Sequence, residues 1–342
     1  MSVETVSESI TAPVDAAHPR DEQIAFLVMT AVLIVAPLFA YPFFLMQALC
    51  FALFACAFNL LVGYVGLLSF GHAMFLGFAG YIAAHFAKLG TIDFNLPFIH
   101  VGPHWNFGAL PPEIAIILGV ICSGLLGLLT GALAIRRQGI YFSMITLALS
   151  QMIYFFCLQA PFTHGEDGIQ AVPQGKLFGF INLSQQMTLY YVVLAIFLFG
   201  FLAIHRIINS PFGEILKAIR ENEPRAISLG YKTDRYKLAA FVLSAALVGL
   251  AGSTKSIVAQ NASLTDVHWT QSGEVVLMTL VGGLGTVFGP VVGAFVIIAM
   301  QNYLAGFGQW VTVIQGVIFV ACVLAFRRGI VGEIAHMFKR SL

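Results

Sequence analysis

Long apolar runs alternate with short polar segments along nearly the whole chain, and this pattern predicts membrane-spanning helices. A helix needs about 20 apolar residues to cross the hydrocarbon core of a bilayer. That rule predicts ten spans: Ile24–Phe44, Gln47–Tyr64, Phe70–Ala87, Glu113–Ile135, Gly139–Ala160, Thr188–His205, Tyr236–Val258, Gln271–Leu284, Thr286–Asn302 and Gln309–Phe326. The eighth is short, so a broken or re-entrant element stays open there. The expected fold is an all-α, polytopic membrane protein with its transmembrane domain over residues 24–326.

The positions of the basic residues test the number of spans. Of the 17 lysines and arginines, 14 fall in one alternating set of connecting segments, and only Lys88, Lys176 and Lys255 fall outside it. The 14 are Arg20, Arg136, Arg137, the seven from Arg206 to Lys237, Arg327, Arg328, Lys339 and Arg340. Because basic residues are retained on the cytoplasmic side during insertion, ten spans place all 14 inside and nine do not. We therefore expect cytoplasmic tails at residues 1–23 and 327–342 and a location in a bacterial inner (plasma) membrane.

Composition supports the membrane and narrows the function classes. The chain is 59% hydrophobic and 10% charged, whereas soluble domains carry about 25% charged residues. It has no basic stripe with interleaved aromatic residues, so nucleic-acid binding is not expected. Its five cysteines lie in apolar runs without a CxxC pair, which favours buried apolar packing over a metal or disulfide function. The acidic residues before position 23 also differ from the basic start of a signal peptide.

One inward-facing segment, residues 206–235, is long and polar. Ser210 followed by Pro211 is a helix-start signal, Pro224 breaks a helix because it lacks the backbone N–H, and Gly230 suits a helix end. The segment is thus predicted to form two short amphipathic helices against the inner face of the membrane. Amphipathicity alone also fits an ordinary helix at the membrane surface.

Several stretches resemble one known family. PRAISLG at Pro224–Gly230 resembles the EAA-xxx-G element with which ABC importer permeases dock their ATPases, although Pro224 replaces the acidic first residue. Longer stretches resemble the M-type permease subunit of branched-chain amino acid ABC importers, over about Phe44 to Glu333. They are GYVGLLSFGHAMFLGFAGYIAA (Gly63–Ala84), RRQGIYFSMITLALSQM (Arg136–Met152), FTHGEDGI (Phe162–Ile169), Ser210–Gly252 and LMTLVGGLGTVFGPVVGAF (Leu277–Phe295). His164 and Glu166 depart from the small residues that the family often carries there.

The resemblance implies a function and a set of partners. It implies a permease for branched-chain or related small amino acids that works with a related second permease as a heterodimer, two ATP-binding subunits and a periplasmic solute-binding protein, in membrane lipid. Similar scaffolds serve urea, short amides and aromatic acids, so the solute stays open. The residues implied in ATPase coupling are Glu214, Lys217, Arg220, Glu221, Arg225, Ala226 and Gly230. The chain has no GxxxxGK[ST] phosphate-binding motif, so the energy is expected to arrive through this segment.

Polar residues inside the predicted spans are the best candidates for the translocation pathway, because burying them unpaired is costly. Candidates are Asn59, His72, Ser143, Thr146, Ser150 and Tyr154. The last four are spaced by three or four residues and therefore share one helix face. Hydrogen bonding between helices is the alternative function for each of them.

Other classes of protein fit less well. A secondary transporter or channel needs ionisable residues at the middle of the membrane, and the predicted spans hold few besides His72. A membrane-bound enzyme needs clustered His, Asp or Glu side chains, which are scattered here. GGLGTVFG at Gly282–Gly289 lacks dinucleotide-binding spacing and instead indicates close helix approach. No enzyme activity and no cofactor are expected.

Overall fold

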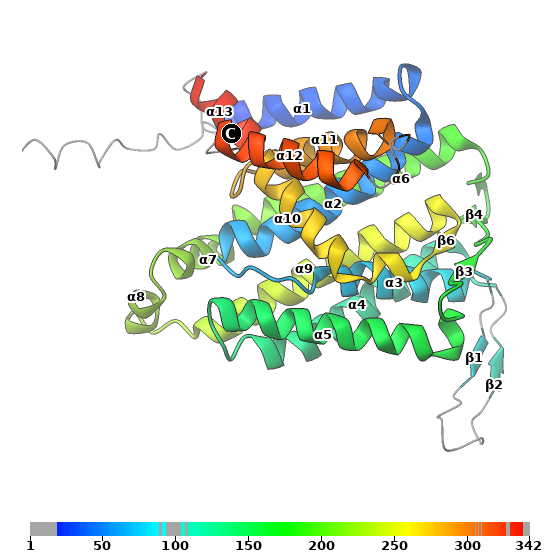
Figure 1. Cartoon of the computed structure of the whole chain (residues 1–342), viewed down its shortest axis with the longest axis horizontal. Helices are drawn as coiled ribbons and strands as arrows, with labels where there is room; N and C mark the ends of the chain where they lie inside the picture. The colour runs from blue at the N-terminus through cyan, green and yellow to red at the C-terminus, as the bar shows by residue number, and fades with distance from the viewer. Residues whose placement is uncertain are drawn as a thin grey trace, which may run out of the picture.

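Thirteen α-helices make up most of the part of the chain that the computed structural model describes, namely residues 19–88, 91–93, 104–106, 109–304, 306, 308, 310–325 and 329–337. They confirm the predicted all-α class (Figure 1). The helices are α1 (Pro19–Val35), α2 (Pro42–Tyr64), α3 (His72–Lys88), α4 (Pro112–Ala134), α5 (Ile140–Gln159), α6 (Gln186–Ile208), α7 (Pro211–Glu221), α8 (Glu223–Ser228), α9 (Thr233–Ala259), α10 (Trp269–Gly282), α11 (Gly289–Leu304), α12 (Trp310–Ala325) and α13 (Gly329–Met337).

The ten predicted spans correspond in order to α1 to α6 and α9 to α12, and the first of them also reaches the start of α2. Among the described helices, α2, α4, α5, α6 and α9 are long and apolar enough to cross a membrane. The other five have 14 to 17 residues. Helix α10, the eighth predicted span, has only 14, which is about 21 Å at 1.5 Å per residue.

Some boundaries differ from the predicted ones. The first predicted span, Ile24–Phe44, runs too far, because α1 ends at Val35 and α2 starts at Pro42. Proline disfavours helical geometry in the residue before it, so Pro42 begins a new helix. Helix α1 starts at Pro19, inside the expected N-terminal tail, and α13 forms inside the expected C-terminal tail. Residues 1–18 and 338–342 of those tails lie outside the described residues.

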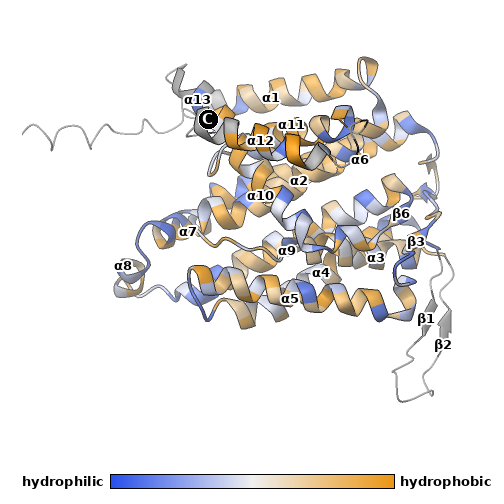
Figure 2. Ribbon diagram, in the orientation of Figure 1, coloured by the Kyte–Doolittle hydropathy of each residue, from blue (hydrophilic) through white to orange (hydrophobic). Residues whose placement is uncertain are grey.

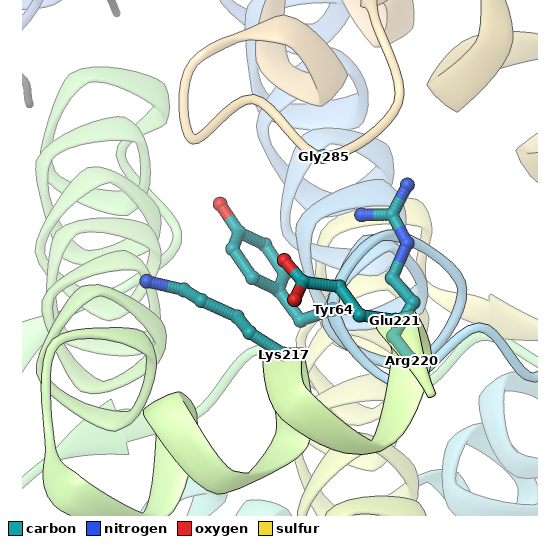
Figure 3. A pocket seen from close by; sticks show the side chains of 5 residues that line it. All are labelled: Tyr64, Lys217, Arg220, Glu221 and Gly285. Atoms are coloured by element: carbon teal, nitrogen blue, oxygen red, sulfur yellow. The ribbon is translucent and has the colours of Figure 1, made fainter. Parts of the chain in front are cut away.

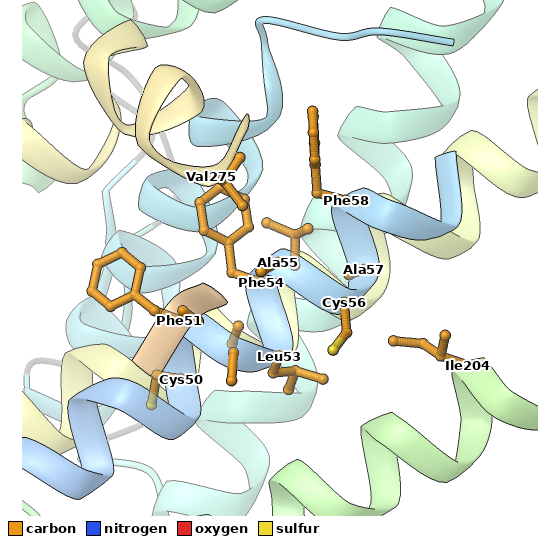
Figure 4. Close-up of a cluster of buried hydrophobic side chains, with 14 of the residues drawn as sticks. Cys50, Phe51, Leu53, Phe54, Ala55, Cys56, Ala57, Phe58, Ile204 and Val275 are labelled. Carbon is orange, nitrogen blue, oxygen red and sulfur yellow. The ribbon is translucent and has the colours of Figure 1, made fainter. Parts of the chain in front are cut away.

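Helix α2 forms the centre of the bundle and packs against α6, α9, α10 and α11. Its sequence is apolar on every side, and nearly all of its residues from Leu45 to Tyr64 are buried (Figure 4). A helix that is hydrophobic all round has no face suited to solvent, which explains its central position. The surfaces that can face lipid or a partner protein are therefore formed by the helices around α2.

Small residues allow the helices around α2 to pack closely. A Cβ atom added to Gly252 of α9 would lie 2.0 Å from the backbone oxygen of Leu76 in α3. A Cβ on Gly293 of α11 would lie 1.8 Å from the backbone oxygen of Met278 in α10. A Cβ on Gly282 would lie 1.9 Å from the backbone oxygen of Gly289, which confirms that glycines in Gly282–Gly289 serve close approach.

The two ends of the bundle differ in structure. Helices α7 and α8 lie together at one end, and the short strands lie at the other, with polar residues gathered at both (Figures 1 and 2). Between them, α4 exposes apolar side chains such as Ile117 and Leu125, and α6 exposes Phe199. The strands pair as β1 (Thr91–Asp93) with β2 (His104–Asn106), β3 (Ile169–Gln170) with β6 (Asn261–Ala262) and β4 (Lys176–Leu177) with β5 (Ile181–Asn182). This distribution is that of a multi-pass membrane protein, because lipid-facing surfaces are apolar and the ends meet water.

Candidate functional site

Helix α7 forms as the sequence signals predict. The Ser210 hydroxyl accepts a hydrogen bond from the backbone N–H of Gly213 at 3.3 Å, and Pro211 occupies the first helical position. The buried face of α7 consists of Gly213, Leu216 and Ile219, which repeat every three residues. The helix packs through this face on α2, α6 and α9.

The predicted break lies between α7 and α8, at Asn222. Its side chain accepts a hydrogen bond from the backbone N–H of Arg225 at 3.0 Å and so caps α8. Pro224 falls in the first turn of α8, where a missing N–H costs nothing. Gly230 follows α8 with a φ of +91°, a left-handed conformation that glycine adopts without strain. The prediction of two short helices is thus confirmed.

Arg220 connects α7 to two other parts of the bundle. Its guanidinium Nη1 donates a hydrogen bond to the backbone oxygen of Gly63, at the end of α2. The same side chain lies beside Gly66, which follows α2, and beside Gly285 in the turn between α10 and α11. Helix α7, α2 and the α10–α11 turn therefore meet at one side chain.

A cavity of about 420 Å³ lies at this meeting point and is lined by Tyr64, Lys217, Arg220, Glu221 and Gly285. Figure 3 shows Lys217, Arg220 and Glu221 on one helix, with Arg220 extending toward Gly285 and the other two side chains pointing to the side, in front of Tyr64. The side chains of Lys217 and Glu214 form an ion pair at 2.8 Å on the outer side of α7. An exposed pair of this kind contributes little to stability.

A second ion pair fixes α8 to α9. Glu223 pairs with Lys237, and the Lys237 side chain is only 4% exposed. Removing one partner from a buried pair costs about 3–5 kcal/mol, since the other charge stays buried. Next to this pair, Ala226 is buried, whereas Arg225 and Gly230 are exposed. The seven residues expected in ATPase coupling are thus brought together at one end of the bundle.

Two exposed apolar side chains on this segment were missed by sequence reasoning. Ile227 is 55% exposed and Leu229 is 70% exposed. Both follow the buried Ala226 at the tip that α8 forms, beyond the apolar surface of the bundle (Figure 1). Both lie in the segment predicted to be amphipathic, but amphipathicity alone could not distinguish residues that pack inward from residues that face out.

His72 lies in the core, enclosed by aromatic rings. Its ring makes edge contacts with Phe58, Phe75 and Phe241 at centroid distances of 5.1 to 5.6 Å. His72 Nε2 lies 3.0 Å from the hydroxyl of Ser244, which itself donates to the backbone oxygen of Ala57 at 2.6 Å. Because the hydroxyl proton is engaged there, Nε2 carries the proton and donates to Ser244.

Asn59 holds the turn between α10 and α11. Its amide nitrogen donates to the backbone oxygen of Thr286 at 2.9 Å, and its oxygen accepts from the backbone N–H of Gly285 at 3.1 Å. Both bonds join α2 to the turn that Arg220 also touches.

The four candidate residues of α5 do indeed lie along one side of that helix. Thr146 and Ser150 are fully buried, while Ser143 and Tyr154 are partly exposed. The Ser143 hydroxyl donates to the backbone oxygen of Leu68 at 2.6 Å, and the Thr146 hydroxyl accepts from the N–H of Phe70 at 3.3 Å. These bonds satisfy backbone groups of the non-helical segment 65–71, which lies between α2 and α3.

A second cavity, of about 360 Å³, lies at the strand end of the bundle. Its walls come from α2, α9, α10, α11 and the segment 261–266 between α9 and α10, and they include the charged residues Lys255, Asp266 and Glu274. Lys255 forms an ion pair with Asp266 and lies over the Phe51 ring, 5.1 Å from its centroid. Sequence reasoning noted Lys255 only as an exception in the placement of the basic residues. Among the described residues, no group of three His, Cys, Asp or Glu side chains is placed to hold a metal ion.

Comparison with known proteins gives one consistent family. Residues 41–325 match the family described as branched-chain amino acid transport system, permease component. The high-affinity branched-chain amino acid transport system permease proteins LivM of Salmonella typhimurium and of Escherichia coli are each 26% identical to the chain over 288 residues, covering 77% of this chain and 63% of the relative. A probable branched-chain amino acid transport permease protein LivH of Methanocaldococcus jannaschii is 28% identical over 181 residues, covering 49% of this chain and 54% of that protein. The chain thus spans less than two thirds of the length of these relatives, and no solved structure matches it.

Proposed function

The chain belongs to the branched-chain amino acid transport permease family, and we propose from this premise that it is one transmembrane half of an ATP-driven importer in a bacterial inner membrane. The solutes proposed are branched-chain or related small amino acids. Both termini and the α7–α8 segment then face the cytoplasm, in agreement with the placement of the basic residues.

The observation that carries the proposal is the α7–α8 segment itself. It is polar, lies at one end of an apolar bundle and presents Ile227 and Leu229 at its tip. An exposed apolar tip with charged neighbours suits insertion into a groove of a partner protein. We assign this tip to the contact with an ATP-binding subunit, with Glu214, Lys217, Glu221, Arg225 and Gly230 on the surrounding surface.

Arg220 supplies the connection from that contact to the transmembrane helices. Displacement of α7 moves a guanidinium that is bonded to the end of α2 and touches the α10–α11 turn. The ion pair of Glu223 with Lys237 carries the same motion to α9. Closure of the ATP-binding subunits would thus rock packed helices as units and change which end of the pathway is open.

The partners proposed follow from the family. Relatives named both LivM and LivH match the chain, which supports a heterodimer of two related permeases. Two ATP-binding subunits and a periplasmic solute-binding protein complete the proposed assembly. The pathway is assigned to the seam along α5, where Ser143 and Tyr154 are partly exposed and Thr146 and Ser150 support the helix from inside.

Capture of the intact assembly tests the contact at the tip. The chain is purified from its native membrane after Leu229→Cys, or after the matched substitution Ser228→Cys one residue earlier, and treated with a short thiol cross-linker. An ATP-hydrolysing subunit is expected to co-purify with both variants and to cross-link to position 229. A chain that purifies without any ATP-hydrolysing partner contradicts the proposal.

A further inference from the structure

The cavity at the strand end has the chemistry of a site for a small zwitterion. Its volume of about 360 Å³ falls at the small end of the range for small-molecule sites, roughly 300–1,000 Å³. One lysine and two carboxylates line it, so its charged walls sum to −1. Such a cavity admits a ligand that brings a positive group, and it repels a plain anion.

Two groups in the walls are suited to a ligand ammonium. Glu274 offers a carboxylate in the same wall as the Gln301 side chain. The side-chain oxygen of Gln271, one helical turn before Glu274, is buried and has no hydrogen-bond partner among the described residues. An unpaired buried acceptor costs about 1–3 kcal/mol, and a donor from a ligand removes that cost.

One group is suited to a ligand carboxylate. The ammonium of Lys255 has three N–H donors, of which the ion pair with Asp266 engages one. The Phe51 ring lies beneath the same ammonium and fixes its position. Lys255 and Glu274 come from different helices, α9 and α10, so the two ligand charges meet different walls.

The rest of the wall is mixed: polar side chains such as Gln47, Asn261 and Thr265 line part of it, and apolar side chains line another part. The side chains of Phe43, Phe51 and Ile298 face the cavity from α2 and α11, and they suit an aliphatic side chain between the two charged walls. The cavity lies at the end of the bundle opposite to α7 and α8, which is the end where an imported solute would arrive.

We propose that this cavity is a recognition site for an α-amino acid zwitterion, with Glu274 and Gln271 binding the ammonium and Lys255 the carboxylate. The proposal rests on the proposed function, because it places a solute checkpoint inside the permease itself. It adds ligand selectivity to that function: the site binds amino acids and does not bind neutral amides or simple carboxylates.

Displacement of bound L-[³H]leucine tests the site in the intact assembly, held in lipid nanodiscs without the solute-binding protein. The competitors are leucine, 4-methylpentanoate, which lacks the ammonium, and leucinamide, which lacks the carboxylate. Both analogues are expected to compete at least about tenfold more weakly than leucine, the ratio that 1.4 kcal/mol of lost contact gives.

Variants assign each charge to its residue. Glu274→Gln is expected to weaken leucine binding at least about tenfold and to abolish the preference for leucine over 4-methylpentanoate. Lys255→Gln is expected to abolish the preference for leucine over leucinamide. Gln271→Leu keeps every charge and is expected to weaken leucine binding about threefold, and Glu166→Gln, an exposed carboxylate at the same end, is the unchanged control.

The outcomes distinguish failure of the proposed binding site from failure of the proposed transport function. Unaltered preferences in Glu274→Gln, or displacement of leucine by urea as well as by leucine itself, overturn the site even where ATP-driven uptake of leucine persists. Uptake that needs no ATP overturns the proposed function while the displacement pattern still reports on the cavity. Where Glu274→Gln fails to assemble, Glu274→Asp, which withdraws the carboxylate by one methylene, and Gln271→Leu are each expected to weaken leucine binding and to reduce its preference over 4-methylpentanoate. Unchanged binding in both overturns the site.

Discussion

At the scale of single residues, Arg220 is the side chain on which the proposed coupling between α7 and the transmembrane helices depends most. It belongs to a short helix at one end, yet it bonds to Gly63 and touches the α10–α11 turn. A hydrogen bond to a charged group contributes about 1.5–3 kcal/mol. We expect a bond of this strength to transmit a displacement of α7 to α2 and to the α10–α11 turn.

Replacing Arg220 tests the coupling. Arg220→Ala is expected to lower ATP-driven uptake about tenfold or more, while ATP hydrolysis by the assembly continues, because the link to α2 is lost. The control is Arg137→Ala, an exposed arginine between α4 and α5 that lies outside the assigned contact, and uptake is expected to stay within about twofold. Uptake and hydrolysis are measured on the same proteoliposomes, and equal losses in both variants contradict the assigned link.

The pair of His72 and Ser244 predicts a stability effect. Ser244→Ala removes the partner of a fully buried His72 N–H, and an unsatisfied buried donor costs about 1–3 kcal/mol. Thermal unfolding can be followed with a thiol-reactive dye, since Cys50, Cys56 and Cys157 are free and buried in the folded protein. Ser228→Ala, on exposed α8, is the control, and a melting temperature equal to that of the control contradicts the account.

Sequence alone located many of these residues but not their partners. Polar residues within apolar runs are visible as exceptions, so Asn59, His72 and Thr146 were candidates from the start. Their hydrogen bonds reach residues 76 to 227 positions away, and no local pattern encodes such pairs. The cavity around Lys255 and Glu274 was not predicted for the same reason, because its walls come from four helices and the segment 261–266.

At the scale of elements, the glycine contacts decide how closely α3 and α9 approach. Gly252→Ala would place a methyl group 2.0 Å from the backbone oxygen of Leu76, and overpacking of this kind costs about 1–3 kcal/mol. The control is Gly273→Ala in α10, where an added Cβ meets no atom within 4 Å.

The two glycine variants are expected to have different effects on the melting temperature. Gly252→Ala lowers the melting temperature, whereas Gly273→Ala leaves it unchanged or raises it, because alanine favours a helix by up to about 1 kcal/mol over glycine. The same thiol-dye measurement serves both. An increase in stability for Gly252→Ala contradicts the close contact between α3 and α9.

The helices are the part of the structure that the sequence predicted best. Length and hydropathy located all ten helices of the bundle, and Ser210, Pro224 and Gly230 placed α7 and α8. The end of α1 was missed because the apolar run continues through Pro37 and Pro42, so hydropathy carries no boundary there. The non-helical segment 65–71 was predicted to within two residues as the gap between the second and third spans, but its hydrogen bonds to Ser143 and Thr146 of a distant helix were not predicted.

At the scale of the whole molecule, the two polar ends are expected to face opposite sides of the membrane. Ser228→Cys in α8 and Glu166→Cys at the strand end place exposed thiols at the two ends. A membrane-impermeant maleimide is expected to label position 166 in intact spheroplasts and position 228 only after permeabilisation. Labelling of both from one side contradicts the proposed topology.

The central claim is that this chain moves an amino acid only when an ATP-binding subunit drives it. The most direct measurement is leucine uptake into proteoliposomes that contain the chain with its second permease, with or without the ATP-binding subunits, and with the solute-binding protein supplied on the opposite side. Uptake is expected only when the ATP-binding subunits and ATP are both present. Equal uptake by the permease chains alone, without ATP, would contradict the account.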